Sequence, residues 1–525
     1  PRSGLWAGGF VLPWIIGDDS EVHMQNYKTN IEVEQRLTSN PFRYRSGIST
    51  SIQLISFIFI SSIFWPQLAR AGVDFRSGNE LLRSCESSEV SEQIYCQGYV
   101  QGAIGTHDVY VMNGARKIIC MPDLSFKLKN FIPTGVSVPS QNKIHPILLT
   151  SNNDSIGSLH VKSKHELKSR DITNIFLNIK KEIKIFRRQK NLFTSNEIKN
   201  FLKYGVKKIY KKWLFKKSEI ERIEKSGSEK ISSNINKIIS IFSKRRPKSL
   251  PSYIPNYKIL ERGQKNIGVL DGTSHFIELF KVKKIIKKNY CKKLNVEKND
   301  YFFLIHAGAG DVGRIFHHNI LDKGENNINP NSKSGRIIKD AYSSAANFAF
   351  VNRLYIYKKI KDALFKMEKN ISASIFSDLP HDYLDYDSKS KIFSHRKGVI
   401  KLYPGNKFKK TNIWVNTGSP YILPTFAGGD AYLMINKKGN KEANFTMSHG
   451  IGRIYTKQEA SKVFKNSKSE KLFKKKIQIF RYNKDDINSQ NPNAFKKTKD
   501  ITDSLEKNNL GEKIAIFKSV GSLKA

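Results

Sequence analysis

Four histidines in the second half of the sequence lie in short segments whose residues suit metal binding or a reaction at phosphorus. They are His275, His306, His381 and His449. A neutral imidazole offers a nitrogen lone pair that can bind Mn²⁺, Zn²⁺ or Fe²⁺ or attack a phosphorus centre. A single buried histidine is more often only hydrogen-bonded, so their order and spacing carry the information. We expect the four imidazoles to meet in one site.

The segments around the first three histidines predict how they are held. His275 follows a small-residue turn and begins an alternating apolar strand, and His381 follows Pro380 in a rigid turn. His306 ends the apolar run Tyr301–Ile305 and opens a glycine-rich loop. Glycines there would let backbone amides approach a phosphate or leave room for a metal.

Further along the chain, cationic side chains lie close to imidazoles. His395-Arg396-Lys397 joins two permanent cations to a histidine, a suitable contact for a triphosphate or an RNA phosphate. His449 is followed by Gly450 and Gly452, with Arg453 four residues on. An imidazole exposed in this way can act as a nucleophile toward phosphorus.

The elements that must position these residues follow from the apolar pattern. Residues 160–250 alternate lysines with isoleucine, leucine and phenylalanine at spacings of three and four, which predicts amphipathic helices that cover a surface or bind RNA. Prolines at 247, 251 and 255 interrupt this pattern, and strand-like segments begin near Ile267. The sequence predicts an α+β domain over 126–525.

The composition divides the chain at about residue 125. Its 525 residues are 39% hydrophobic, enough to bury a core, and carry 90 Lys+Arg against 46 Asp+Glu, a formal charge of +44. Residues 1–125 hold ten basic and twelve acidic residues, so the excess belongs to the remainder. Two interpretations stay open: a lysine-rich coding bias that produces a solvated surface, or a basic face for an RNA backbone.

The region before residue 126 predicts two separate segments. In 1–71, Arg43 and Arg45 precede an apolar run at 52–65 and Ala69-Arg70-Ala71 follows it, the order of a secretory signal, although a buried helix or strand is the alternative. The run is too short for a confident membrane span, so no stable membrane insertion is expected. Residues 72–125 hold Cys85, Cys96 and Cys120, which allow one disulfide if the segment is secreted.

Two resemblances to known families organise these observations. Ser77–Leu82 with the cysteine segments Cys96–Gly102 and Ile119–Pro122 resembles the small Tai-type immunity proteins of type VI secretion amidases. From about Ile132 to the C-terminus, six ordered segments resemble the RNA-splicing ligase RtcB family. These are Thr273–Glu278, His306–Gly313, Ala345–Arg353, His381-Asp382, His395–Val399 and His449–Arg453.

The RtcB resemblance implies a chemistry and a set of roles. It implies a cytoplasmic, GTP- and Mn²⁺-dependent enzyme with two metal ions, which joins RNA 3′-phosphate or 2′,3′-cyclic phosphate ends to 5′-hydroxyl ends, with an accessory activating protein as a further partner. By resemblance His449 would carry GMP, and the metal ligands would be His275, His306, His381 and Asp154. The nucleotide or RNA site would be lined by Asn347, Arg353, His395, Arg396, Lys397, Arg453 and Lys524.

Departures from the family pattern leave alternatives to ligase activity. The family's Asp-X-X-Cys-Gly metal motif should fall near residues 153–159, where Asp154 remains but Ser158 stands about where the thiolate belongs. A hydroxyl is a poorer ligand for a borderline metal. The alternatives are therefore a catalytically degenerate RtcB-like RNA-binding protein, or a secreted immunity protein fused to unrelated sequence.

Overall fold

The computed structural model describes residues 136–524, apart from 142, 147–148, 150–152, 184–191, 224–226, 229–230, 232, 271–274, 325–326, 368–370, 388–390, 409–411, 438–444, 456, 466–476 and 482–486. The predictions for 1–71 and 72–125, including the signal-like run and the disulfide, lie outside these residues. Within the described part of the chain, no helix combines the length and the apolar character needed to cross a bilayer.

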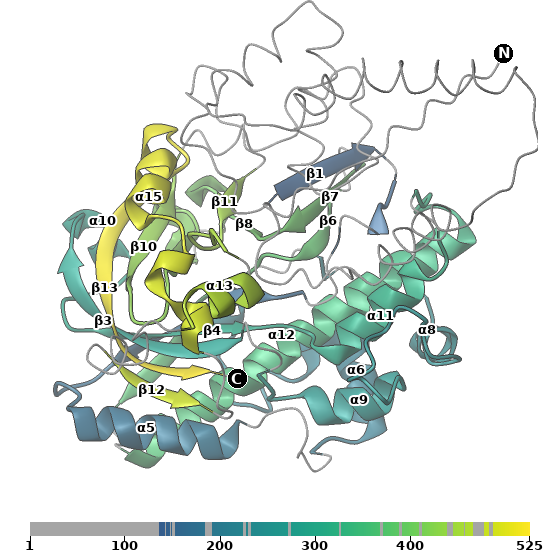
Figure 1. The fold of residues 1–525 in the computed structure, drawn as a ribbon, viewed down its shortest axis with the longest axis horizontal. Helices are drawn as coiled ribbons and strands as arrows, with labels where there is room; N and C mark the ends of the chain where they lie inside the picture. Colours follow the sequence, from purple (N-terminus) through teal and green to yellow (C-terminus); the bar gives the residue numbers. More distant parts are fainter. Residues whose placement is uncertain are drawn as a thin grey trace, which may run out of the picture.

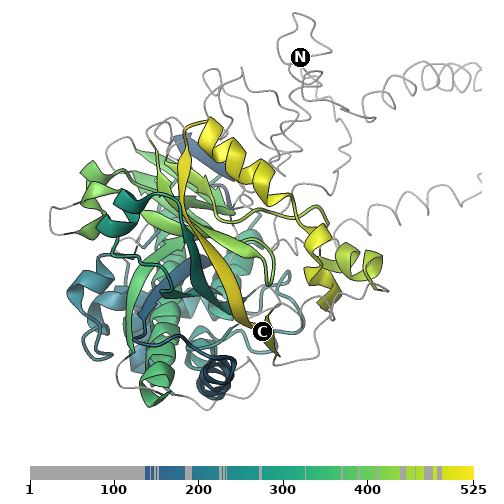
Figure 2. The same cartoon turned by 90° about the vertical axis from the view of Figure 1, so that its left-hand side faces the viewer.

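A large sheet, almost entirely antiparallel, forms the centre of the molecule (Figure 1). Its strand order is β5-β2-β4-β3-β13-β10-β9, and β12 pairs in parallel with β13. Figure 2 shows the long β13 running through this sheet. The strands are β2 (Ser155–Lys162), β3 (Phe276–Ile285), β4 (Tyr301–Ala307), β5 (Ser372–Pro380), β9 (Pro420–Leu423), β10 (Asp430–Asn436), β12 (Gln478–Arg481) and β13 (Gly511–Lys524).

Both faces of the sheet are buried, which explains why β4 is apolar along nearly its whole length. Along β4, Phe303 and Ile305 belong to the core under the helices, whereas Phe302 and Leu304 belong to a second core on the other face. Successive side chains of a strand point to opposite faces. By this alternation His306 lies on the face opposite the helices.

Helices cover one face of the sheet around the 35-residue α12 (Lys333–Met367). The central part of α12 is buried on nearly all sides, as expected for a helix between a sheet and other helices. The helices around it are α5 (Ser169–Glu182), α6 (Ser195–Tyr204), α8 (Ile235–Phe242), α9 (Ile259–Asn266) and α11 (Asp311–Leu321). The amphipathic α5, α6 and α8 confirm the helices predicted for 160–250.

Two smaller sheets and a third core complete the fold. One sheet has the order β1-β7-β6 and the other pairs β11 with β8. The third core joins β8, β9, β10 and β11 to a C-terminal helix, α15 (Thr498–Lys507). The strands of the small sheets are β1 (Val136–Gln141), β6 (Tyr383–Asp387), β7 (Ile392–Lys397), β8 (Val399–Lys401) and β11 (Thr446–Ser448). The remaining helices of the described residues are η4 (Gly205–Lys208), α7 (Lys217–Ile220), α10 (Lys288–Lys293), η5 (Gly405–Lys407), η6 (Ile413–Asn416), α13 (Lys457–Val463), η8 (Ile487–Gln490) and η9 (Pro492–Ala494). The predicted α+β class is confirmed.

Candidate functional site

Four of the predicted site residues lie at one end of neighbouring strands in the large sheet, and this group is called here the strand-edge site. Asp154 immediately precedes β2, His275 immediately precedes β3, His306 lies at the end of β4, and His381 directly follows β5. Because β5, β2, β4 and β3 are antiparallel neighbours, the starts of β2 and β3 lie beside the ends of β4 and β5. The pairing of His306 with both Ile156 and Phe276 shows this register.

These four side chains are buried and lie in close pairs. His275 Nε2 is 3.0 Å from Asp154 Oδ1, and His306 Nε2 is 2.8 Å from His381 Nε2. The rings of His275 and His306 are 5.2 Å apart between centroids, which links the two pairs. The imidazole rings of His275, His306 and His381 are therefore neighbours in the structure.

This donor set fits a divalent transition metal by its chemistry. Imidazole nitrogens and carboxylate oxygens are the ligands that Mn²⁺, Zn²⁺ and Fe²⁺ accept, at distances of about 2.0–2.2 Å. Two ligand atoms held at right angles around one ion would be about 3 Å apart, close to the two pair distances. In the described part of the chain, however, no three His, Cys, Asp or Glu side chains are arranged around a common point.

His449 approaches the histidine pair from a different sheet. It directly follows β11, is half-buried, and its ring centroid lies 4.2 Å from that of His381 and 6.5 Å from that of His306. Its Nδ1 donates a 2.6 Å hydrogen bond to the carbonyl oxygen of Gly398. Because a carbonyl only accepts, Nδ1 carries a proton, and in the neutral imidazole the lone pair is then on Nε2.

Gly398 holds this imidazole through a turn that joins β7 to β8. Its φ of 66° lies in the left-handed region that glycine adopts most easily. The Gly398 amide donates a 2.7 Å hydrogen bond to Asp382 Oδ1, and the preceding His381 carbonyl accepts from Val399. The same short turn therefore fixes the positions of both His381 and His449.

Arg353 supports the site from behind rather than lining a surface. It is fully buried on α12, with Nε 3.0 Å from both carboxylate oxygens of Asp378. Its Nη1 donates to the carbonyl oxygens of Asn153 and Ala307, each at 3.2 Å. These two residues directly adjoin Asp154 and His306, so the guanidinium ties the backbone beside both of them.

Three other predicted nucleotide-site residues also make internal contacts. His395 Nε2 accepts from the His145 amide at 2.9 Å, and Arg396 Nη1 donates to Thr446 Oγ1 at 2.7 Å. Both are fully buried. Asn347 Nδ2 donates to the Leu202 carbonyl at 2.9 Å, on the side of α12 that packs against α6.

The remaining predicted residues lie at the margins of the site. Lys397 ends β7 one residue before Gly398 and is partly exposed. The Arg453 guanidinium stacks 4.3 Å from the Phe495 ring, and its Nε donates to the Tyr455 carbonyl. Lys524 Nζ is 4.4 Å from the centre of the ring of Phe276, the residue that directly follows His275 in the chain.

Two buried carboxylates were not singled out from the sequence. Asp378 accepts from Arg353 and, at 2.9 Å, from the Tyr357 hydroxyl. Glu278 accepts from Ser519 Oγ at 2.5 Å and from the Gly428 amide at 3.2 Å, and burial raises the pKa of its carboxyl. The signal in the sequence was position: Glu278 ends the family-like segment Thr273–Glu278, and Asp378 stands three residues before His381. A carboxylate buried in a strand requires a specific partner, which the sequence alone does not name.

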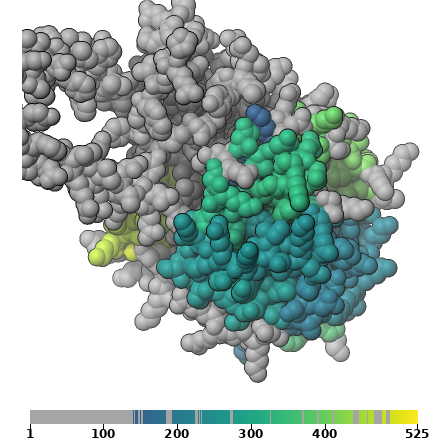
Figure 3. Space-filling model, turned by 90° about the vertical axis from the view of Figure 1, so that its right-hand side faces the viewer, coloured from purple at the N-terminus to yellow at the C-terminus, as the bar shows by residue number. Residues whose placement is uncertain are grey.

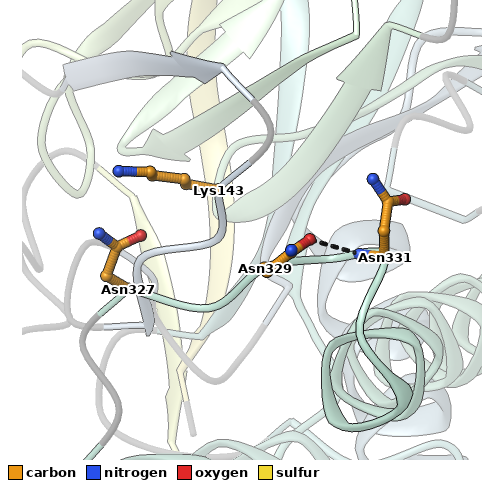
Figure 4. Close-up of a pocket in the computed structure, with 4 residues that line it drawn as sticks. All are labelled: Lys143, Asn327, Asn329 and Asn331. Atoms are coloured by element: carbon orange, nitrogen blue, oxygen red, sulfur yellow. Dashed lines mark hydrogen bonds between the residues drawn. The ribbon is translucent and has the colours of Figure 1, made fainter.

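The loop before α12 contributes an open polar pocket near His145. It is lined by Lys143, Asn327, Asn329 and Asn331 (Figure 4). Asn329 Oδ1 accepts a 2.9 Å hydrogen bond from the Asn331 amide. None of the predicted site residues lines this pocket, so the strand-edge site is distinct from it.

The chain is similar in sequence to proteins of one family. The family model described as tRNA-splicing ligase RtcB matches residues 108–525. A protein named tRNA-splicing ligase RtcB from Methanococcus maripaludis is 26% identical over 291 residues, which cover 50% of this chain and 61% of the relative. A protein with the same name from Nanoarchaeum equitans is 25% identical, over 50% of this chain and 61% of its own length. Another from Methanocaldococcus jannaschii is 23% identical, over 63% of this chain and 35% of its own length.

The chain thus spans about three fifths or less of the length of these three relatives. The matches bear out the resemblance drawn from the six ordered segments and extend it toward the N-terminus, to residue 108. They give no support to the resemblance of residues 72–125 to Tai-type immunity proteins.

Proposed function

Because the chain belongs to the tRNA-splicing ligase RtcB family, we propose that it is a cytoplasmic RNA ligase that joins 3′-phosphate or 2′,3′-cyclic phosphate ends to 5′-hydroxyl ends. The observation that carries the proposal is the His449 imidazole, half-buried beside His381 with its Nδ1 proton held by Gly398. A histidine held in this tautomer presents Nε2 as a nucleophile.

The proposed reaction transfers GMP through this nitrogen. His449 Nε2 attacks the α-phosphorus of GTP, an N–P bond forms, and the bond to the β-phosphate oxygen breaks to release pyrophosphate. An RNA 3′-phosphate oxygen then attacks the same phosphorus and the N–P bond breaks, which returns the electron pair to Nε2. The oxygen of a 5′-hydroxyl finally attacks the phosphorus of the activated 3′-phosphate, its proton passes to water, and the phosphoanhydride bond breaks to release GMP. A 2′,3′-cyclic phosphate end is hydrolysed to the 3′-phosphate before these steps.

The strand-edge side chains are the proposed ligands of Mn²⁺. They are Asp154, His275, His306 and His381, whose donor atoms suit that ion. Bound divalent ions would neutralise the triphosphate and stabilise the leaving oxygen. Arg353 is proposed to keep the backbone beside two of these ligands in place, and the basic side chains at the margin, Lys397, Arg453 and Lys524, to contact the nucleotide or the RNA.

A labelling experiment tests the proposal. The full chain is incubated with Mn²⁺ and GTP labelled at the α-phosphate, and the labelled peptide is identified by mass spectrometry. We expect one GMP per chain on His449, in an acid-labile bond typical of a phosphoramidate. His449→Ala should abolish the label, whereas His165→Ala, which removes an exposed histidine, should keep it. Absence of label in the wild-type chain, or equal label in both variants, would refute the ligase assignment.

A second candidate function is an RNA-binding protein without catalysis. It is favoured by the positions of Ser158 and Cys291, the two side chains that could stand in for the metal-binding thiolate of the family. Ser158 Oγ is 2.9 Å from Ser377 Oγ, and the only cysteine in the described residues, Cys291, is buried in the second core, where burial raises the pKa of its thiol to about 11. Tight RNA binding without Mn²⁺ uptake by equilibrium dialysis would favour this function over ligation.

A further inference from the structure

A run of exposed lysines covers the segment that follows α6. The seven lysines of residues 203–217 are all exposed, and this group is called here the lysine surface: Lys203, Lys207, Lys208, Lys211, Lys212, Lys216 and Lys217. They lie on the end of α6, on η4, on the turns that lead to α7 and on the first residue of α7. The sequence pattern left open whether such lysines are only solvated or contact RNA.

Most of the lysine surface carries charge without an acidic partner. Within the described ranges, Lys212 is the only one of the seven in an ion pair, with Glu197 at 3.1 Å. Lysines of the neighbouring α12 differ, because Lys358, Lys359 and Lys361 pair with Asp362, Glu182 and Glu219. Neighbouring like charges repel, so the lysine surface is an electrostatic cost that a polyanion would relieve.

An aromatic ring lies within this surface. Tyr204 is 37% exposed, and the ammonium groups of Lys203 and Lys208 lie 5.0 and 5.3 Å from the centre of its ring. Leu214, ten residues on, is 83% exposed. Ammonium groups for phosphates and a ring for an unpaired base form the combination that contacts RNA without reading its sequence.

The lysine surface is anchored to the helix that supports the strand-edge site. Asn347 Nδ2 donates to the carbonyl oxygens of Leu202 and Lys203, which fixes the end of α6 against α12. In Figure 1, α6 lies with α8, α9 and α11 on one side of α12, and β8, β10 and β11 lie on the other. Figure 3 views the molecule from that helical side.

We infer that the lysine surface binds the body of the RNA substrate while its broken ends occupy the site at His449. The inference rests on the proposed function and goes beyond it, because it assigns a second area of contact with the RNA. A substrate with a folded body long enough to extend past α12 reaches both areas, whereas a short oligonucleotide reaches only the site.

The test compares two charge-reversal variants of the full chain. Lys207→Glu/Lys208→Glu/Lys211→Glu alters the lysine surface, and Lys284→Glu/Lys288→Glu/Lys292→Glu makes the same charge change on exposed lysines of β3 and α10. Fluorescence anisotropy measures affinity for a tRNA-sized folded RNA and for a six-nucleotide RNA with a 3′-phosphate, over a series of salt concentrations.

We expect the lysine-surface variant to bind the folded RNA about tenfold or more weakly, with the slope of log affinity against log salt reduced by about 2–3. Affinity for the six-nucleotide RNA and GMP transfer to His449 should stay within twofold of wild type, and so should all values for the control variant. The thermal midpoints should show that both variants remain folded.

The inference would be overturned if both variants lost the same affinity for the folded RNA. It would also be overturned if the lysine-surface variant lost as much affinity for the six-nucleotide RNA as for the folded RNA. Failure of the proposed ligase function gives a different result, namely no GMP label in any chain. A selective loss of folded-RNA binding in unlabelled chains would therefore support the lysine surface while refuting ligation.

Discussion

Removal of the Arg353 guanidinium should destabilise the protein more than loss of any exposed arginine. In Arg353→Met, Asp378 keeps its Tyr357 contact but loses its buried counter-charge, and the carbonyls of Asn153 and Ala307 lose a donor. Breaking one partner of a buried ion pair costs roughly 3–5 kcal/mol. With an unfolding entropy of about 2.1 cal/mol/K per residue over about 400 residues, the thermal midpoint should fall by about 4–6 °C.

Differential scanning calorimetry measures this change against a matched control. Arg336 lies exposed near the start of the same helix, so Arg336→Met should shift the midpoint by less than about 1 °C. Arg353→Met/Asp378→Leu should recover part of the loss, because the carboxylate is no longer buried without its counter-charge. A fall of less than 1 °C for Arg353→Met, or no recovery in the double variant, would refute the supporting role of this ion pair.

Two further predictions concern packing and pH. Gly157→Ala would place a Cβ 1.7 Å from the Tyr357 hydroxyl oxygen, so the tyrosine must move away from Asp378. The thermal midpoint should therefore fall by several degrees. An unchanged midpoint would contradict the packing of β2 against α12. Burial, followed by the nearby charges of His318 and Lys397, lowers the pKa of His317 from 6.5 to about 3. Protons therefore bind the unfolded chain first, so stability should be lost as pH falls from 6.5 toward 3, by up to about 1.4 kcal/mol per pH unit. Thermal midpoints at pH 7, 6 and 5 should fall less steeply in His317→Gln than in wild type, and parallel curves would show that this histidine does not titrate as stated.

Local pattern was sufficient to predict much of the secondary structure. Lysine alternating with apolar residues predicted the amphipathic helices α5, α6 and α8, because one helical face must be buried and the other solvated. The apolar run Tyr301–Ile305 likewise predicted the central strand β4. These are short-range features, for which spacing along the chain fixes which side chains share a face.

The histidines show where sequence reasoning succeeded and where it stopped. Their order and contexts indicated one site, and the structure brings His275, His306, His381 and His449 together. The sequence contained no signal for the pairs they form, nor for the Gly398 carbonyl that sets the tautomer of His449. Those contacts depend on strand register and on a turn from another sheet.

The cationic residues separate most clearly what each level decided. The sequence by itself determined that Arg353, Arg396 and the lysines of 203–217 are charged, and their chemistry favours phosphate in every case. Only the tertiary structure buried the two arginines against carboxylates and left the lysine surface exposed. The physical reason is that a charge is either matched inside the core or kept in water, and which of these occurs depends on neighbours that are distant in the sequence.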